Sequence, residues 1–192
     1  MVPQITKIMK HLIVFVILST SNMLQTLAQD IYKGENGKVK FFSDALLEDI
    51  EAKSSNVTAA LNTSTGEVAA RIPIKSFVFD KSLMQEHFNE NYLESDRYPD
   101  ATFAGKALKI PVLKPGEVHS ITLTGKLTIH GITQPRDIAA VLRVNDDGSI
   151  TATANFKVKV EDHKVKVPNL LFQNIAEVVE VTLDLNLKHR GI

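Results

Sequence analysis

Residues 150–160 read Ile-Thr-Ala-Thr-Ala-Asn-Phe-Lys-Val-Lys-Val, with an apolar side chain at every even position and a polar one at every odd position. This period of two predicts a β-strand that buries one face and exposes the other. At about 3.3 Å per residue the stretch would span roughly 36 Å, which is long for a strand in a globular protein. The fold must therefore accommodate long, two-faced strands.

The same alternation recurs along the chain. Residues 121–129, 138–144 and 179–187 follow it, and Gly125 falls on the apolar face of the first of these segments. A conservative count gives about eight strands, most of them separated by short turns. Such a series predicts an antiparallel meander.

Turn residues mark where the predicted strands reverse. Residues 57–61 and 68–74 alternate on either side of Asn62-Thr-Ser-Thr-Gly66, which predicts a hairpin. Asn145-Asp-Asp-Gly148 and Pro115-Gly116 are further turns, since Asp-Gly readily supplies the positive φ of a tight reversal.

The apolar strand faces have to be covered, so the sheet must close into a barrel or fold into a sandwich. The long strands favour a barrel. An outer-membrane barrel would need an apolar outer band with aromatic girdles. The chain has no tryptophan, and its polar strand face carries Lys126, Lys157, Lys159 and Lys188. We therefore predict an all-β, eight-stranded antiparallel barrel with an apolar lumen.

One segment has helical spacing instead. Ser82 and Gln85 match a capping box, which predicts a helix over residues 82–94. Its apolar face would carry Met84, Phe88 and Tyr92. A second helical turn is predicted near Leu46–Ile50.

Composition excludes several classes of protein. The 192 residues contain no cysteine, which rules out disulfides, thiolate metal sites and a cysteine nucleophile. Lys and Arg number 22 against 22 Asp and Glu, so the chain lacks the basic excess of a nucleic-acid-binding protein. Hydrophobic residues make up 44% of the chain, too many for a disordered one.

Signals for catalysis are weak. No glycine-rich phosphate loop and no nucleophile elbow is present, and the five histidines beyond residue 28 lack metal-ligand spacing. His130 is expected at a strand end, as a hydrogen-bonded or solvated side chain, or as a polar group at the barrel mouth. His87 is expected to pack on the helix. We predict no enzyme and no cofactor, and leave open a metal site using His87 or His130.

The lumen can be filled by side chains or hold a ligand. Aromatic residues on the inward face favour a plain core. Small inward residues favour a cavity: Ala59, Ala70, Ala140, Ala152 and Ala154. The pattern alone leaves both readings open, and a tall apolar cavity would suit an elongated lipid.

Two strings resemble a known family. Tyr98-Pro-Asp-Ala-Thr-Phe-Ala-Gly105, preceded by His87-Phe-Asn-Glu-Asn-Tyr92, and Leu127-Thr-Ile-His-Gly-Ile-Thr133 look like signature stretches of the YceI-like, polyisoprenoid-binding periplasmic proteins. Phe41-Phe-Ser-Asp-Ala45 and Phe77-Val-Phe79 are similar to that family as well. The resemblance covers nearly all of residues 29–192.

The resemblance implies a lipocalin-like, extended eight-stranded barrel with one amphipathic helix alongside. It also implies a long isoprenoid chain, such as a quinone or polyprenyl tail, in the lumen, and a periplasmic or secreted location. It assigns no catalytic residue. Combined with the alternation, it predicts these ligand-binding residues: Phe77, Phe79, Met84, Phe88, Phe103, Leu127, Ile129, Phe156 and Val158.

Two other functions stay open at this point. The first is a non-catalytic interaction or stress-response module with a filled core. The second is an enzyme or metalloprotein using His87 or His130. Long strand edges in an imperfect barrel would also allow a homodimer.

The N-terminus has the features of a secretory signal peptide. Lys7 and Lys10 precede the apolar run Leu12–Leu18, and a polar stretch ends at the small residue Ala28. Seven apolar residues are too few to cross a bilayer core of about 30 Å as a helix. We therefore expect residues 1–28 to be removed, leaving a domain of residues 29–192 that does not span the membrane. Export of a chain without cysteine favours a bacterial periplasm.

Cleavage after Ala28 is directly testable. The exported protein should have the intact mass of residues 29–192 and an N-terminal sequence beginning Gln29-Asp30. A mature chain that still starts at Met1 would contradict the predicted signal peptide.

Overall fold

Nine strands form one antiparallel sheet within residues 30–44, 49–165 and 176–189, the part of the chain that the computed structural model describes. They belong to a compact unit, Asp30–Gly191. The strands are β1 (Ile31–Ser43), β2 (Ile50–Asn62), β3 (Glu67–Pro73), β4 (Val78–Phe79), β5 (Asp100–Ala107), β6 (Val118–Ile129), β7 (Ile132–Val144), β8 (Ile150–Lys159) and β9 (Val178–His189).

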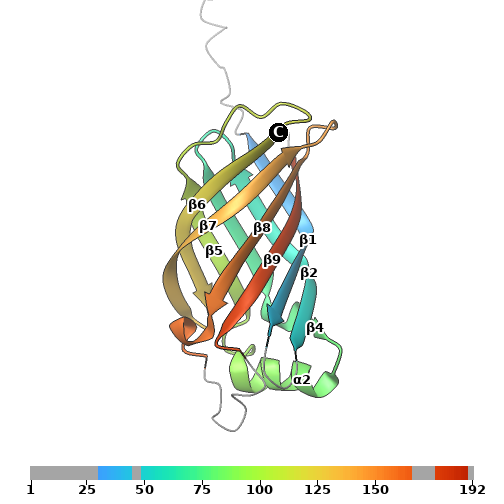
Figure 1. Ribbon diagram of the computed structural model, residues 1–192, viewed down its shortest axis with the longest axis vertical. Coiled ribbons are helices and arrows are strands. Elements are labelled where there is room, and N and C mark those ends of the chain that lie inside the picture. Colours follow the sequence, from blue (N-terminus) through green and yellow to red (C-terminus); the bar gives the residue numbers. More distant parts are fainter. Residues whose placement is uncertain (1–29, 45–48, 166–175, 190–192) are drawn as a thin grey trace, which may run out of the picture. The chain divides into compact units, whose positions relative to one another are not determined.

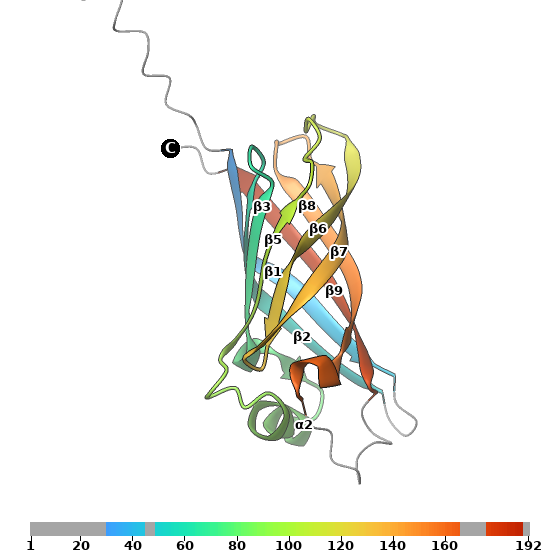
Figure 2. The same cartoon turned by 90° about the vertical axis from the view of Figure 1, so that its left-hand side faces the viewer.

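Eight of these strands close into a barrel (Figures 1 and 2). The order is β1-β9-β8-β7-β6-β5-β3-β2, and pairing of β1 with β2 completes the ring. The two-residue strand β4 pairs with the start of β2 and lies outside the ring. The predicted all-β, eight-stranded antiparallel barrel is thus confirmed.

Helical segments gather at one end of the barrel (Figure 1). They are η1 (Ile74–Ser76), α2 (Ser82–His87), the π-helical turn η2 (Phe88–Tyr92) and η3 (Val160–His163). The predicted helix at residues 82–94 therefore exists, but it changes from α to π geometry at Phe88.

The predicted capping box is wrong. Lys81 is the N-cap, and no side-chain hydrogen bond caps the helix there. The Gln85 side chain instead accepts a hydrogen bond from the backbone N–H of Phe79 at 3.4 Å. A hydrogen bond to β4 has thus replaced the predicted capping hydrogen bond within the helix. Most of the predicted turn at 46–50 and all of the predicted signal peptide lie outside the described residues, and Ile50 begins β2.

The alternation predicts the inward face correctly. On β8, Ile150 and Val158 are buried, and Thr153, Asn155 and Lys157 are exposed. The two predicted hairpins form as well: β2 pairs with β3, and β7 pairs with β8. In the second turn the carboxylate of Asp147 accepts hydrogen bonds from the N–H and Oγ of Ser149, at 2.9 and 2.6 Å, which lowers the pKa of Asp147.

Two glycines face each other on the paired strands β5 and β6. Gly105 pairs with Gly125, and the ring of Phe103 lies over both. A Cβ atom would stand 2.6 Å from Phe103 Cζ at Gly105 and 2.7 Å from the same atom at Gly125. The missing side chains therefore make the space that the Phe103 ring occupies inside the barrel.

We expect Gly125→Ala to lower the free energy of unfolding by about 1–3 kcal/mol, the usual cost of overpacking. The added Cβ would also meet the backbone oxygen of Ala104 at 2.5 Å, so a ring movement alone cannot relieve the clash. Urea unfolding followed by circular dichroism measures this loss. Thr124→Ala, on the exposed face of the same strand, is the control and should change the value by about 0.5 kcal/mol or less. Equal losses in both variants would contradict the packing argument.

Candidate functional site

An apolar cavity of about 250 Å³ lies inside the barrel at the end that carries α2. Its wall is built from inward residues of β1, β6, β8 and β9 and from α2 and η2. A second cavity of about 100 Å³ occupies the other half of the lumen. The two adjoin, because both are lined by Ile72, Ala101, Leu127 and Phe156.

The structure brings eight of the nine predicted ligand-binding residues together. The larger cavity is lined by Phe77, Phe79, Met84, Phe88, Leu127, Ile129, Phe156 and Val158. The ninth, Phe103, lines the second cavity. All five small inward residues, Ala59, Ala70, Ala140, Ala152 and Ala154, line that second cavity too. Their binding of a ligand stays a prediction.

Four phenylalanines close the larger cavity on one side. The Phe41 and Phe88 rings stack with centroids 5.5 Å apart and an interplanar angle of 22°. Phe77 and Phe79 meet Phe88 at 5.6 and 4.9 Å, in edge and tilted arrangements. Because Phe88 begins the π turn η2, this cluster attaches the helical segment to the barrel wall.

Sequence reasoning missed the contribution of β1. Val39 and Phe41 line the larger cavity, as do Val179 and Val181 of the neighbouring strand β9. The alternation of β9 was visible in the sequence and could have identified the last two. In β1 the pairing register shifts around Gly37, so a period of two is hard to follow there.

Among the residues that the structure describes, few polar ones line the cavity, namely Ser43, His87, Tyr92 and His163. The Ser43 hydroxyl already accepts a hydrogen bond from the N–H of Ala176 at 2.8 Å. Burial raises the pKa of the Tyr92 hydroxyl, so that side chain stays protonated at neutral pH. The fully buried His163 donates from Nδ1 to the carbonyl oxygen of Ile132 at 3.0 Å, and its Nε2 has no hydrogen-bond partner among the described residues.

His130 has a structural role. It forms with Gly131 the two-residue turn between β6 and β7, and both residues have positive φ, 51° and 70°. His130 Nε2 lies 2.7 Å from a carboxylate oxygen of Glu94, and its Nδ1 lies 3.3 Å from the carbonyl oxygen of His163, so that a neutral ring donates to one of these two acceptors. The imidazole thus ties the end of η2 and the η3 turn to one hairpin, which agrees with the expectation of a hydrogen-bonded residue.

The described parts of the chain bear on the alternative of an enzyme or a metalloprotein that uses His87 or His130. No group of three or more His, Cys, Asp or Glu side chains among those residues is placed to hold a metal ion. His87 lines the cavity, whereas His130 is bonded to Glu94 at the hairpin. In the same residues, no helix is long and apolar enough to span a membrane.

The profile of the YceI-like domain matches residues 32–187, which include all of the barrel strands but the outermost residues of β1 and β9. The chain belongs to the YceI-like family. The resemblance seen in the sequence strings is therefore confirmed. No curated protein sequence matches this YceI-like chain significantly.

Solved structures share the fold at low sequence identity. A polyisoprenoid binding domain from Saccharophagus degradans is 15% identical, with a TM-score of 0.72 over 84% of this chain and 99% of the other. BcnA from Burkholderia cenocepacia is 18% identical, with a TM-score of 0.64 over 78% and 95%. A YceI protein from Campylobacter jejuni is 18% identical, with a TM-score of 0.59 over 76% and 88%.

The role of His130 in this YceI-like protein can be tested by two substitutions. His130→Asn keeps a residue that tolerates positive φ but removes the imidazole, and should lower the free energy of unfolding by about 1–2 kcal/mol. His130→Ala should cost about 1 kcal/mol more, because alanine adopts that conformation poorly. Chemical unfolding and metal analysis of the purified proteins measure both effects. Unchanged stability in His130→Asn together with loss of a bound metal would instead favour the metal site.

Proposed function

We propose that this protein binds an elongated isoprenoid-type lipid in the barrel lumen and carries it in the periplasm. The observation that carries the proposal is the pair of adjoining apolar cavities, because a lumen meant only as a core would be filled to crystal-like density. The polyisoprenoid-binding description of the Saccharophagus degradans relative supports the same ligand class.

The shape of the lumen suits a chain rather than a compact ligand. The larger cavity, about 250 Å³, is slightly smaller than the roughly 300–1,000 Å³ of most small-molecule sites, and the second cavity extends it along the barrel. Each methylene group buried there would contribute about 0.8 kcal/mol. A prenyl chain could thus gain affinity from length alone, with few polar contacts.

The accessible surface of the inward side chains argues against a fully filled core. Phe156 of β8 and Val181, Leu183 and Leu185 of β9 point inward but are only half-buried. Atoms inside a closed barrel keep such accessible surface only where space remains beside them. This observation favours a ligand over the interaction or stress-response module.

A binding role is also favoured over a catalytic one. The polar groups on the cavity wall are few and come from separate elements: Ser43 from β1, His87 from α2, Tyr92 from η2 and His163 from η3. Ser43 and His163 already take part in hydrogen bonds to the backbone. The proposal further includes the quinone or polyprenyl identity of the tail and the periplasmic location, both of which the family resemblance implies, and a homodimer, which rests on the sequence alone.

Chain length gives a sharp test of lipid binding. Geranylgeraniol should bind about tenfold or more tightly than geraniol, because its longer chain reaches the second cavity. Ala154→Phe places a ring in that cavity and should weaken geranylgeraniol binding by about tenfold while changing geraniol binding much less. Competition binding with the purified protein, checked for folding by circular dichroism, measures both affinities.

Thr122→Phe is the control, because it adds the same ring to the exposed face of β6 at a residue that lines neither cavity. It should leave both affinities unchanged. Equal weakening in the two variants, or equal affinity for the two alcohols, would count against a lipid in the lumen. Native mass spectrometry of protein isolated from its own host should in addition reveal a co-purified isoprenoid lipid.

A further inference from the structure

The junction between β7 and β8 is only half paired. β7 and β8 share five register pairs, from Val144–Ile150 to Ala140–Ala154. The neighbouring junctions are much longer, with twelve pairs between β6 and β7 and ten between β8 and β9. Both strands are described throughout, and residues 132–139 of β7 and 155–159 of β8 have no ladder pairs with each other. We call this unpaired stretch the β7–β8 seam.

A proline stands on the open edge of the seam. In an antiparallel strand, successive residues direct their backbone groups alternately to the two neighbours. The N–H of Val144 bonds to the carbonyl oxygen of Glu117 on the β6 side, so odd-numbered residues of β7 face β8. Pro135 is one of these, and it has no N–H to donate. A continuous ladder to β8 would lack a bond at this position.

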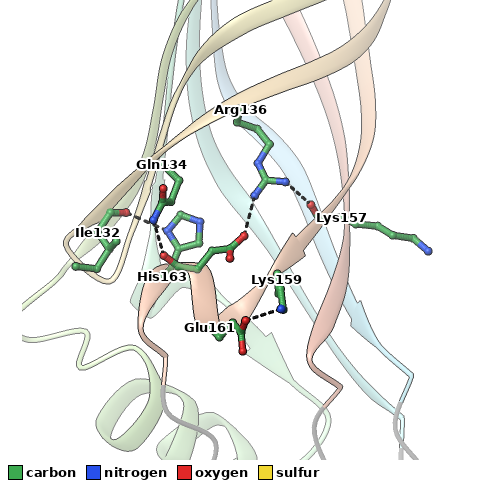
Figure 3. A network of polar contacts seen from close by, with 8 residues as sticks. Ile132, Gln134, Arg136, Lys157, Lys159, Glu161 and His163 are labelled. Carbon is green, nitrogen blue, oxygen red and sulfur yellow. Dashed lines mark hydrogen bonds and ion pairs between the residues drawn. The ribbon is translucent and has the colours of Figure 1, made fainter.

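Side chains bridge the seam instead (Figure 3). Arg136 donates from Nη1 to the carbonyl oxygen of Lys157 at 3.0 Å. Gln134 donates from Nε2 to the carbonyl oxygen of Asp162 at 2.8 Å. In the opposite direction, His163 donates from Nδ1 to the carbonyl oxygen of Ile132 at 3.0 Å. Each of these hydrogen bonds thus joins a side chain on one side of the seam to the backbone on the other side.

The sequence pattern of β7 changes at the same place. Ile138, Ala140 and Leu142 are buried on the inward face, but the next two inward positions are Arg136 and Gln134. Within the part of the chain that the structure describes, the seam is also incompletely satisfied, because the buried Nε of Arg136 and Nε2 of His163 have no hydrogen-bond partner there. These polar groups hold the junction more weakly than a backbone ladder would.

The seam leads to the larger cavity. One side of the seam is formed by β8 and continues into the η3 turn. Four residues of this side line the cavity: Phe156, Val158, Val160 and His163. At the far end of the barrel, Ile110 and Leu113 of the β5–β6 loop pack on the cluster of Leu61 and Leu142. A chain entering through the seam would therefore reach the lumen directly, without displacing that loop.

We infer that the β7–β8 seam is the lateral portal through which an isoprenoid-type lipid enters and leaves the lumen. The inference rests on the proposed lipid binding. Opening requires the Arg136, Gln134 and His163 bridges and the contact of His130 with the His163 carbonyl to break, whereas the neighbouring β6–β7 and β8–β9 junctions would have to give up ladder hydrogen bonds.

Cross-linking tests the portal cleanly because the chain has no native cysteine. Asp137→Cys with Lys157→Cys places one exposed thiol on each side of the seam, to be joined by a short bis-maleimide. The control is Asp137→Cys with Thr124→Cys, since Thr124 is the ladder partner of Asp137 on β6. The measured quantities are the affinity for tritiated geranylgeraniol and its exchange rate against excess unlabelled alcohol.

We expect the seam cross-link to slow exchange by about tenfold or more, with affinity unchanged once equilibrium is reached. The control cross-link should leave both quantities unchanged. Normal exchange in the seam-linked protein would overturn the portal and leave the proposed lipid binding intact. Failure of the unmodified protein to bind the alcohol would overturn the proposed function itself, and the portal with it.

Weakening the bridges gives an independent test that does not depend on the cross-link. Gln134→Ala with Arg136→Ala removes two of the three bridges and should speed exchange by about tenfold. Arg143→Ala, an exposed arginine in the paired half of the same strand, is the matched control and should leave exchange unchanged. Unchanged exchange in the double variant would also overturn the portal.

Discussion

The pairing of β1 with β2 is the contact on which the rest of the structure depends. It joins the two ends of the strand order, so the apolar faces of eight strands enclose a lumen instead of meeting water. Closure requires β1 to approach β9 closely, and glycine makes this feasible. A Cβ atom at Gly34 would stand 2.7 Å from the backbone oxygen of Asn186. The register shifts around Gly34 and Gly37 are therefore part of how the barrel closes.

The barrel wall combines two kinds of closure. Most junctions are backbone ladders, which bind strongly and are insensitive to side-chain identity. Half of the β7–β8 junction is held by the side chains of Gln134, Arg136 and His163. The same lumen is thus enclosed mostly by strands joined through backbone ladders and, along the β7–β8 seam, by hydrogen bonds from the side chains of three residues. The proposed lipid carrier needs both kinds of closure, because it must shield its lipid from water and still exchange it.

Much of this structure was predictable from period-two alternation. The long, regular strands β6, β8 and β9 have their inward faces where the pattern places them, and eight predicted residues line one cavity. Prediction failed where tertiary contacts replaced local rules. The Gln85 side chain bonds to Phe79 instead of capping its own helix, and β1 loses its period at a glycine bulge. The polar inward residues Gln134 and Arg136 were a visible signal of the seam. A search for alternating apolar residues, however, counts them only as exceptions to the strand pattern.

The Phe103 ring over Gly105 and Gly125 has a consequence for how the lumen could change in evolution. This ring borders the second cavity, where the chain end of an elongated guest would lie. A smaller side chain at position 103 would lengthen the available channel, and a side chain at either glycine would push the ring inward and shorten it. Related proteins could thus acquire preferences for longer or shorter guests through one aromatic residue and its two glycines, while every strand of the barrel stays in place.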